Sequence, residues 1–136
     1  MIQAPKQTRV LRQGAIPRIP RTLRIPFVRR CTLVGAASEM EGMVLDLSLN
    51  GAYVRSGRSP RDGESLEVCF RVPGNEREIR IRSLVAWINL QQSHPVHSLP
   101  PGFGLSFLDT APSDARLIAE TIHAYCSSNP VYRQYL

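Results

Sequence analysis

The sequence predicts a mainly β domain that ends in one α-helix. Between residues 66 and 72, apolar residues alternate with Glu67, Cys69 and Arg71, which is the period of a strand with one buried face. From Pro112 to about Ser127, apolar residues recur instead with the period of an amphipathic helix. A chain of 136 residues has the length of a single domain with a modest core.

Six segments carry strand-like patterns. They are residues 24–34, 43–46, 52–55, 66–72, 79–88 and 102–108. Pro26 cannot donate a hydrogen bond to a neighbouring strand, so the start of the first strand is expected at an edge. The segment 35–42 is polar, with Glu39 and Glu41, and is interpreted as a connection.

Three residues near the end of the β region carry finer expectations. Gly102 and Gly104 fall on the same side of the last strand, which predicts close backbone packing or a bulge. Trp87, the only tryptophan, alternates with apolar residues of the fifth strand. It is assigned to the core or to an end of the fold rather than to a ligand platform.

The helix is delimited by residues with known terminal preferences. Thr110 or Ser113 can cap its first turn, and Asp114 there complements the positive end of the helix dipole. Asn129 and Pro130 end it. The residues that follow, 131–136, are apolar enough to dock on the domain or to mediate self-association.

The stretch Asp46-Leu47-Ser48-Leu49-Asn50-Gly51 separates two apolar runs. Short side chains such as those of Asp46 and Ser48 interrupt a strand ladder by hydrogen bonding to the nearby backbone. Asn50 and Gly51 tolerate a positive φ and form the strongest short hairpin signal. The residues themselves therefore predict a strand, a tight turn and a second strand.

Positive charge is concentrated at the N-terminus. Residues 1–30 contain eight basic and no acidic residues, whereas the other 106 contain nine basic and eleven acidic residues. Residues 1–20 are interpreted as a basic, proline-containing arm that is extended or disordered. Such an arm attracts phosphates, nucleic acid, acidic lipid or an acidic partner, or serves as a solvated tail.

Several function classes find little support. No catalytic constellation or phosphate-binding glycine loop is present, so the chain is not expected to be an enzyme or to need a cofactor. His94 and His97 lie among prolines without a nearby carboxylate, which argues against a metal site. The three cysteines are widely separated, which predicts reduced, partly buried thiols in a cytoplasmic protein. The sequence shows no signal peptide and no long apolar segment, so no integral membrane segment is expected.

The spacing Asp46-x-Ser48-x-x-Gly51 between two strands resembles the signature of the PilZ family, bacterial receptors for cyclic di-GMP. The resemblance covers roughly residues 18–126 and implies a small antiparallel barrel of about six strands with the helix packed over one open end. It divides the chain into an arm (1–20), a PilZ-like domain (21–130) and a C-terminal tail (131–136).

The resemblance also implies a nucleotide site. The family places an Arg-x-x-x-Arg motif before the first strand, and Arg24-Ile25-Pro26 fits its second arginine, but Pro20 stands where the first would be. Arg21 and Arg18 are the nearest substitutes, and an odd separation in an extended segment puts Arg21 and Arg24 on opposite faces. The implied ligand-binding residues are Arg18, Arg21, Arg24, Asp46, Ser48 and Gly51.

Each of these residue types suits the ligand. Arginine forks bind phosphate and the guanine edge, and the carboxylate of Asp46 accepts hydrogen bonds from guanine N–H groups. The hydroxyl of Ser48 donates, and Gly51 lets the ligand approach the backbone.

Two other functions remain open. In the first, the chain is a degenerate PilZ-like adaptor that binds a protein partner and no nucleotide, consistent with its altered arginine spacing. In the second, the basic arm binds nucleic acid nonspecifically, although it lacks the interleaved aromatic residues typical of single-strand platforms. The sequence does not distinguish the oligomeric states.

Overall fold

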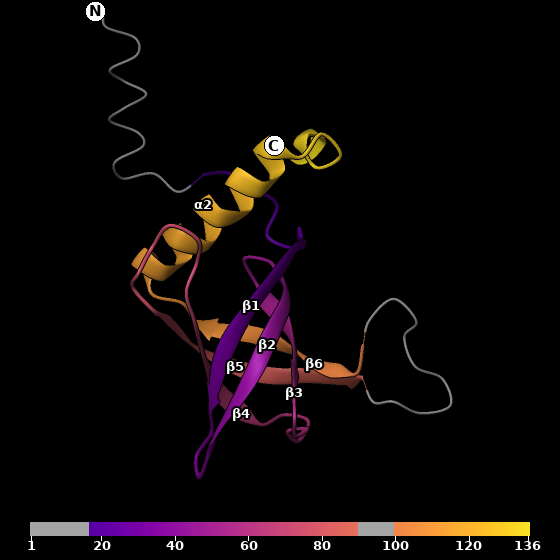
Figure 1. Ribbon diagram of the computed structural model, residues 1–136, viewed down its shortest axis with the longest axis vertical. Coiled ribbons are helices and arrows are strands. Elements are labelled where there is room, and N and C mark those ends of the chain that lie inside the picture. Colours follow the sequence, from indigo (N-terminus) through magenta and orange to yellow (C-terminus); the bar gives the residue numbers. More distant parts are fainter. Residues whose placement is uncertain (1–16, 90–99) are drawn as a thin grey trace, which may run out of the picture.

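The computed structural model describes residues 17–89 and 100–136, in which six antiparallel strands close into a barrel (Figure 1). The strands are β1 (Ile25–Val34), β2 (Glu39–Leu47), β3 (Gly51–Ser56), β4 (Ser65–Phe70), β5 (Ile79–Asn89) and β6 (Gly102–Asp109). They follow one another around the barrel in the order β1-β2-β3-β6-β5-β4, and β4 pairs with β1. The helix α2 (Pro112–Ser128) and the short 3-10 helix η1 (Arg133–Tyr135) come last. The expected fold class is confirmed.

The first hairpin is longer than the sequence pattern predicts. β2 begins at Glu39, opposite Val34 of β1, so the expected polar connection over 35–42 is wrong for its second half. The turn is tight because Gly35 donates its backbone N–H to the Ser38 carbonyl at 2.8 Å. Glu39 and Glu41 are exposed, and a strand with an exposed face accepts such side chains without losing its backbone ladder.

A bulge in β5 reverses the alternation on which the assignment of Trp87 rests. The pairing with β6 shifts register between Val85 and Trp87, so one extra residue is inserted and the following side chains change faces. Trp87 lies on the outer face with 38% of its surface exposed. Its assignment to the core is therefore wrong.

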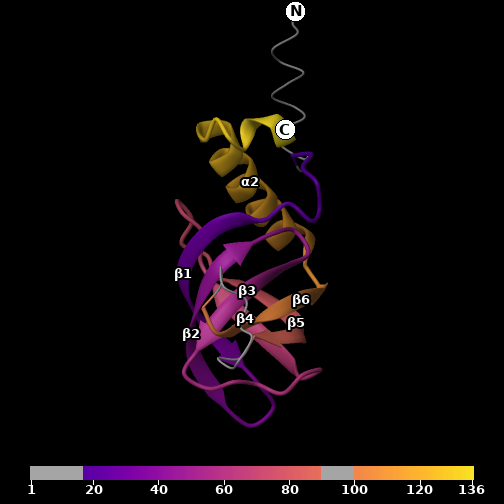
Figure 2. The same cartoon turned by 90° about the vertical axis from the view of Figure 1, so that its right-hand side faces the viewer.

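The helix α2 covers one end of the barrel, as both views show (Figures 1 and 2). Ile118, Ile122 and Cys126 enter the same apolar core as the strand residues, which confirms the predicted packing. The expected side-chain caps are wrong, because the residue preceding the helix is Ala111 and no side chain caps the first turn. Pro112 occupies the start of the helix instead, where a missing N–H costs little.

The free, buried state of the cysteines agrees with the sequence. All three cysteines are free and buried, and burial raises the pKa of the Cys31 thiol to about 12 and that of Cys69 to about 11. No helix in the described ranges is long and apolar enough to cross a membrane. His94 and His97 lie outside the described residues, as does most of the predicted arm.

Candidate functional site

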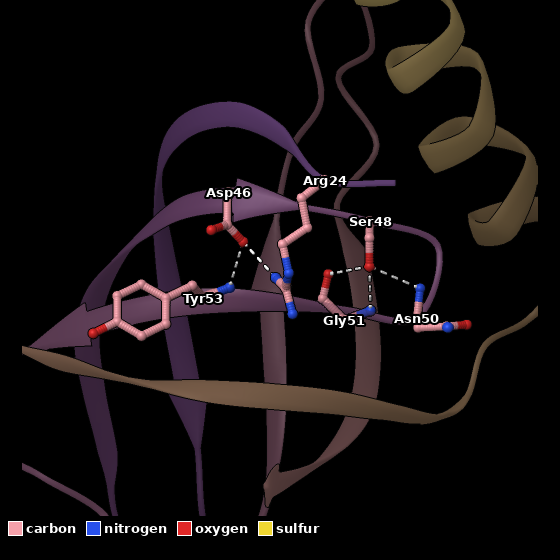
Figure 3. A network of polar contacts seen from close by, with 6 residues as sticks. All are labelled: Arg24, Asp46, Ser48, Asn50, Gly51 and Tyr53. Atoms are coloured by element: carbon pink, nitrogen blue, oxygen red, sulfur yellow. Dashed lines mark hydrogen bonds and ion pairs between the residues drawn. The ribbon is translucent and has the colours of Figure 1, made fainter. Parts of the chain in front are cut away.

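The turn between β2 and β3 is organised around the side chain of Ser48 (Figure 3). The Ser48 hydroxyl is buried, and its oxygen accepts hydrogen bonds from the backbone N–H groups of Asn50 and Gly51, both at 3.1 Å. It also donates to the Gly51 carbonyl at 3.4 Å. These contacts occupy the hydroxyl within the turn. Ser48 therefore shapes the site, and its expected role as a donor to the ligand is not what the geometry favours.

Gly51 is needed for a reason that the sequence pattern does not indicate. The glycines with positive φ among the described residues are Gly63 and Gly74, so the expectation of a positive φ at Gly51 is wrong. A Cβ at Gly51 would instead lie 2.0 Å from the carbonyl oxygen of Leu105. The absent side chain admits the neighbouring strand β6, and this close approach fixes the position of the turn.

Asp46 is the polar centre of the site. Its Oδ1 accepts a hydrogen bond from the backbone N–H of Tyr53 at 3.2 Å and lies 2.6 Å from a terminal nitrogen of Arg24 (Figure 3). A register shift between Val44 and Asp46 marks a bulge, a feature that redirects a side chain locally. The structure thus brings together Arg24 and Asp46, which are 22 residues apart. Both side chains remain accessible, with exposed fractions of 47% and 21%.

The segment before β1 is not extended. Leu23 donates its backbone N–H to the Pro20 carbonyl at 3.2 Å, which closes a turn with Arg21 in it. The argument that Arg21 and Arg24 point to opposite faces assumed an extended chain, and it does not apply here. Arg18 and Arg21 are exposed and make no ion pair with a carboxylate of the described residues.

An aromatic pair continues the site across the outer face of the barrel. Register places Asp46 beside Tyr53, Tyr53 beside Gly104, and Gly104 beside Trp87. The rings of Tyr53 and Trp87 stack across β6 with centroids 5.4 Å apart and planes at 28°. Gly104 permits this contact, since a Cβ there would lie 2.1 Å from the indole nitrogen.

Sequence reasoning missed this aromatic pair, although one signal pointed to it. The glycines of β6 predicted close packing or a bulge. Gly104 packs closely against Trp87, and the pairing of β5 with β6 has a bulge next to Trp87. The Tyr53 hydroxyl donates to the Pro100 carbonyl and accepts from the side-chain amide of Asn89 at 3.1 Å. These bonds hold the ring of Tyr53 in place beneath Trp87. The result is a partly exposed aromatic face in line with a carboxylate and an arginine.

The described residues contain no group of three or more histidine, cysteine, aspartate or glutamate side chains that could hold a metal ion. What the arrangement provides is a carboxylate acceptor, an arginine donor and a partly exposed aromatic surface. Such a set suits a ligand that combines phosphates with hydrogen-bonding bases.

Comparison with known proteins agrees with this architecture. The profile of the PilZ domain family matches residues 18–124. The structure of the Bacillus subtilis inhibitor of motility (MotI/DgrA) superposes with a TM-score of 0.65 at 23% identity, covering 84% of this chain and 54% of that one. The chain therefore corresponds to about half the length of that protein. The PilZ domain of CeSA from a cellulose-synthesizing bacterium gives a TM-score of 0.52 at 15% identity, covering 76% of this chain and 99% of that domain. No curated protein sequence is significantly similar to the chain.

Proposed function

The chain belongs to the PilZ domain family, a family of cyclic di-GMP-binding signalling domains, and on that premise we propose that it binds cyclic di-GMP and transmits this signal to a protein partner. One observation carries the proposal. Arg24, from the segment before β1, lies 2.6 Å from Asp46 at the end of β2, so the arginine that this chain retains from the family motif meets the signature aspartate at one accessible place. The proposal assigns the chain to the bacterial cytoplasm, as a receptor or adaptor and not an enzyme.

In the proposed complex, the arginines bind phosphate and Asp46 binds a guanine. One oxygen of Asp46 already accepts two hydrogen bonds, from Tyr53 and Arg24, and its other oxygen can accept from guanine N–H groups. Arg18 and Arg21 supply further guanidinium donors from the preceding turn. The exposed face of Trp87 offers a surface on which a base can stack, while Ser48 and Gly51 keep the turn in shape.

The ion pair between Arg24 and Asp46 does not prevent this exchange of partners. An exposed ion pair contributes only about 0–1 kcal/mol, and nearly half of the Arg24 side chain is exposed, at 47%. Hydrogen bonds to charged groups contribute about 1.5–3 kcal/mol each. Moving the Arg24 guanidinium from a carboxylate to a phosphate is therefore favourable once the ligand supplies donors to Asp46.

The test is a calorimetric titration of cyclic di-GMP into the chain at physiological salt. We expect Arg24→Ala to weaken binding by about 1.5–3 kcal/mol, which is about 10- to 150-fold. Asp46→Asn should also weaken binding, although its amide oxygen can still accept from Tyr53 and so preserves the turn. The matched control is Arg61→Ala, because Arg61 is exposed in the loop after β3, away from the signature turn. Unchanged affinity in both Arg24→Ala and Asp46→Asn would refute the site assignment.

A second candidate function is an adaptor that binds a protein and no nucleotide. It is favoured by the proline that stands where the family has its first arginine, Pro20. Absence of heat at high ligand concentration, repeated at a second temperature to exclude a zero enthalpy of binding, would support this function.

A further inference from the structure

An apolar hollow of about 430 Å³ lies between α2, the first residues of β1 and the loop that follows β4. Ile25, Phe27 and Val72 contribute apolar lining from the barrel side, and Leu117 and Ala124 contribute it from the helix. Figure 1 shows the loop after β4 beside α2, above the barrel. The hollow is large enough to receive one or two apolar side chains.

Two arginines lie next to this hollow without a carboxylate partner. Arg29 and Arg71 line a second hollow of about 530 Å³, and the two hollows share the segment 72–75. The Arg29 guanidinium lies 6.0 Å from the centre of the Phe27 ring, which links it to the apolar hollow. Arg71 donates from Nε to the Glu76 carbonyl at 2.8 Å.

In lacking an ion pair, Arg29 and Arg71 differ from several other arginines of the barrel. Arg24, Arg77 and Arg80 each contact a carboxylate at 2.6–3.0 Å, whereas neither Arg29 nor Arg71 forms an ion pair with any residue of the described ranges. The guanidinium groups are thus available to an external anion. The hollow that these two arginines line also contains one acidic residue, Glu76, so its net charge is positive. Together with the apolar concavity, it is complementary to an acidic, amphipathic ligand.

We propose that this surface is a docking groove for an acidic amphipathic segment of a partner protein. An apolar side chain of the partner fills the hollow beneath α2, and neighbouring carboxylates pair with Arg29 and Arg71. This deepens the proposed function, on whose protein-partner step it rests, by defining the chemistry of the partner. Binding at the groove does not require nucleotide.

The shape of the groove favours a peptide over a membrane surface. Its apolar part is a concavity between a helix and a loop, which a flat bilayer cannot enter. The ion pair of Arg77 with the buried carboxylate of Asp114, at 2.7 Å, ties the segment after β4 to α2.

The groove and the nucleotide site share the beginning of β1. Pro26 lines the apolar hollow and also pairs with Asp46 across the β1–β2 ladder. A ligand that repositions Arg24 therefore acts on the residues immediately before the groove. The two sites are therefore adjacent through β1.

The test uses fluorescein-labelled short peptides composed of Leu, Phe, Glu and Asp, without nucleotide. Two matched sets replace the acidic residues by Lys or the apolar residues by Ser. Fluorescence anisotropy should show that the acidic amphipathic set binds the full chain at least about tenfold more tightly than either control set, since one hydrogen bond to a charged group contributes on that order.

Variants locate the binding on the molecule. Ala124→Trp fills the hollow from an exposed position of α2 and should abolish binding, as should Arg29→Gln combined with Arg71→Gln. Arg61→Gln serves as the control and should bind like the unchanged chain. Failure of every acidic amphipathic peptide to bind would overturn the proposal, as would binding that Ala124→Trp leaves unchanged. Binding to phosphatidylserine vesicles but not to the peptides would also overturn it.

The two proposals fail separately. Asp46→Asn should lose cyclic di-GMP binding and retain the acidic peptides, whereas Ala124→Trp should lose the peptides and retain the nucleotide. A chain that binds peptides but no nucleotide would refute the receptor function and keep the groove. A chain that binds nucleotide but no peptide would refute the groove and keep the receptor function.

Discussion

The Asp46–Gly51 turn and the preceding segment 17–24 form the two halves of the proposed nucleotide site, and they are built differently. The turn satisfies its own polar groups, with the Ser48 hydroxyl bonded to two backbone N–H groups, and its position is fixed by the contact of Gly51 with β6. The segment 17–24 runs beside α2 (Figures 1 and 2) and leaves Arg18 and Arg21 exposed. The turn is preformed, whereas in the segment 17–24 Arg24 contacts Asp46 but Arg18 and Arg21 have no carboxylate partner among the described residues.

Substitution of Gly51 tests the preformed half most severely. In Gly51→Ala the new Cβ would lie 2.0 Å from the Leu105 carbonyl oxygen, so β3 and β6 would have to separate. We expect a loss of about 3 kcal/mol or more in the free energy of unfolding, because the obstacle is backbone and not a flexible side chain. Urea denaturation measures this loss.

Gly57→Ala is the matched control. Nothing lies within 4 Å of the position of a Cβ at Gly57, so the free energy of unfolding should change by less than about 0.5 kcal/mol. Equal stability of the two variants would show that the close approach of β6 does not hold the turn.

Substitution of Ser48 has a smaller effect on the same half. Ser48→Ala removes the acceptor for the backbone N–H groups of Asn50 and Gly51 in a buried position. A buried donor left without a partner costs about 1–3 kcal/mol, and urea denaturation should show a loss in this range. Ser65→Ala, at an exposed position of β4, should leave stability unchanged. A Ser48→Ala variant as stable as the unchanged chain would mean that water replaces the hydroxyl at no cost.

The two halves of the site show which of its features could be predicted from the sequence. Alternation and turn residues predicted the strands, and the signature spacing predicted that Arg24 and Asp46 belong to one site. The reason for glycine at position 51 was not predictable, because the obstacle comes from β6, which lies more than fifty residues further along the chain. A local pattern carries no information about which strand becomes a neighbour.

Trp87 illustrates the same limit. Strict alternation placed it with Val85, but the bulge between these residues moves the indole to the outer face. A bulge depends on pairing with β6 and leaves no clear trace in the sequence of β5 itself. The first half of β2 was missed for a related reason, since Glu39 and Glu41 resemble loop residues until the ladder with β1 is known.

Arg24 comes from the segment 17–24 and contacts Asp46 in the other half of the site. Of the substitutions within the site, Arg24→Ala is expected to have the smallest effect on folding. The Arg24 side chain in its ion pair with Asp46 is 47% exposed and that of Asp46 is 21% exposed. Arg24→Ala should therefore reduce the free energy of unfolding by no more than about 1 kcal/mol, as measured by urea denaturation at low and high salt. The same substitution is expected to weaken cyclic di-GMP binding by about 1.5–3 kcal/mol. A loss of stability larger than the loss of binding energy would assign Arg24 to the scaffold. The expected opposite ranking would mean that the sequence retains this arginine for the ligand and tolerates its contact with Asp46 in the free chain.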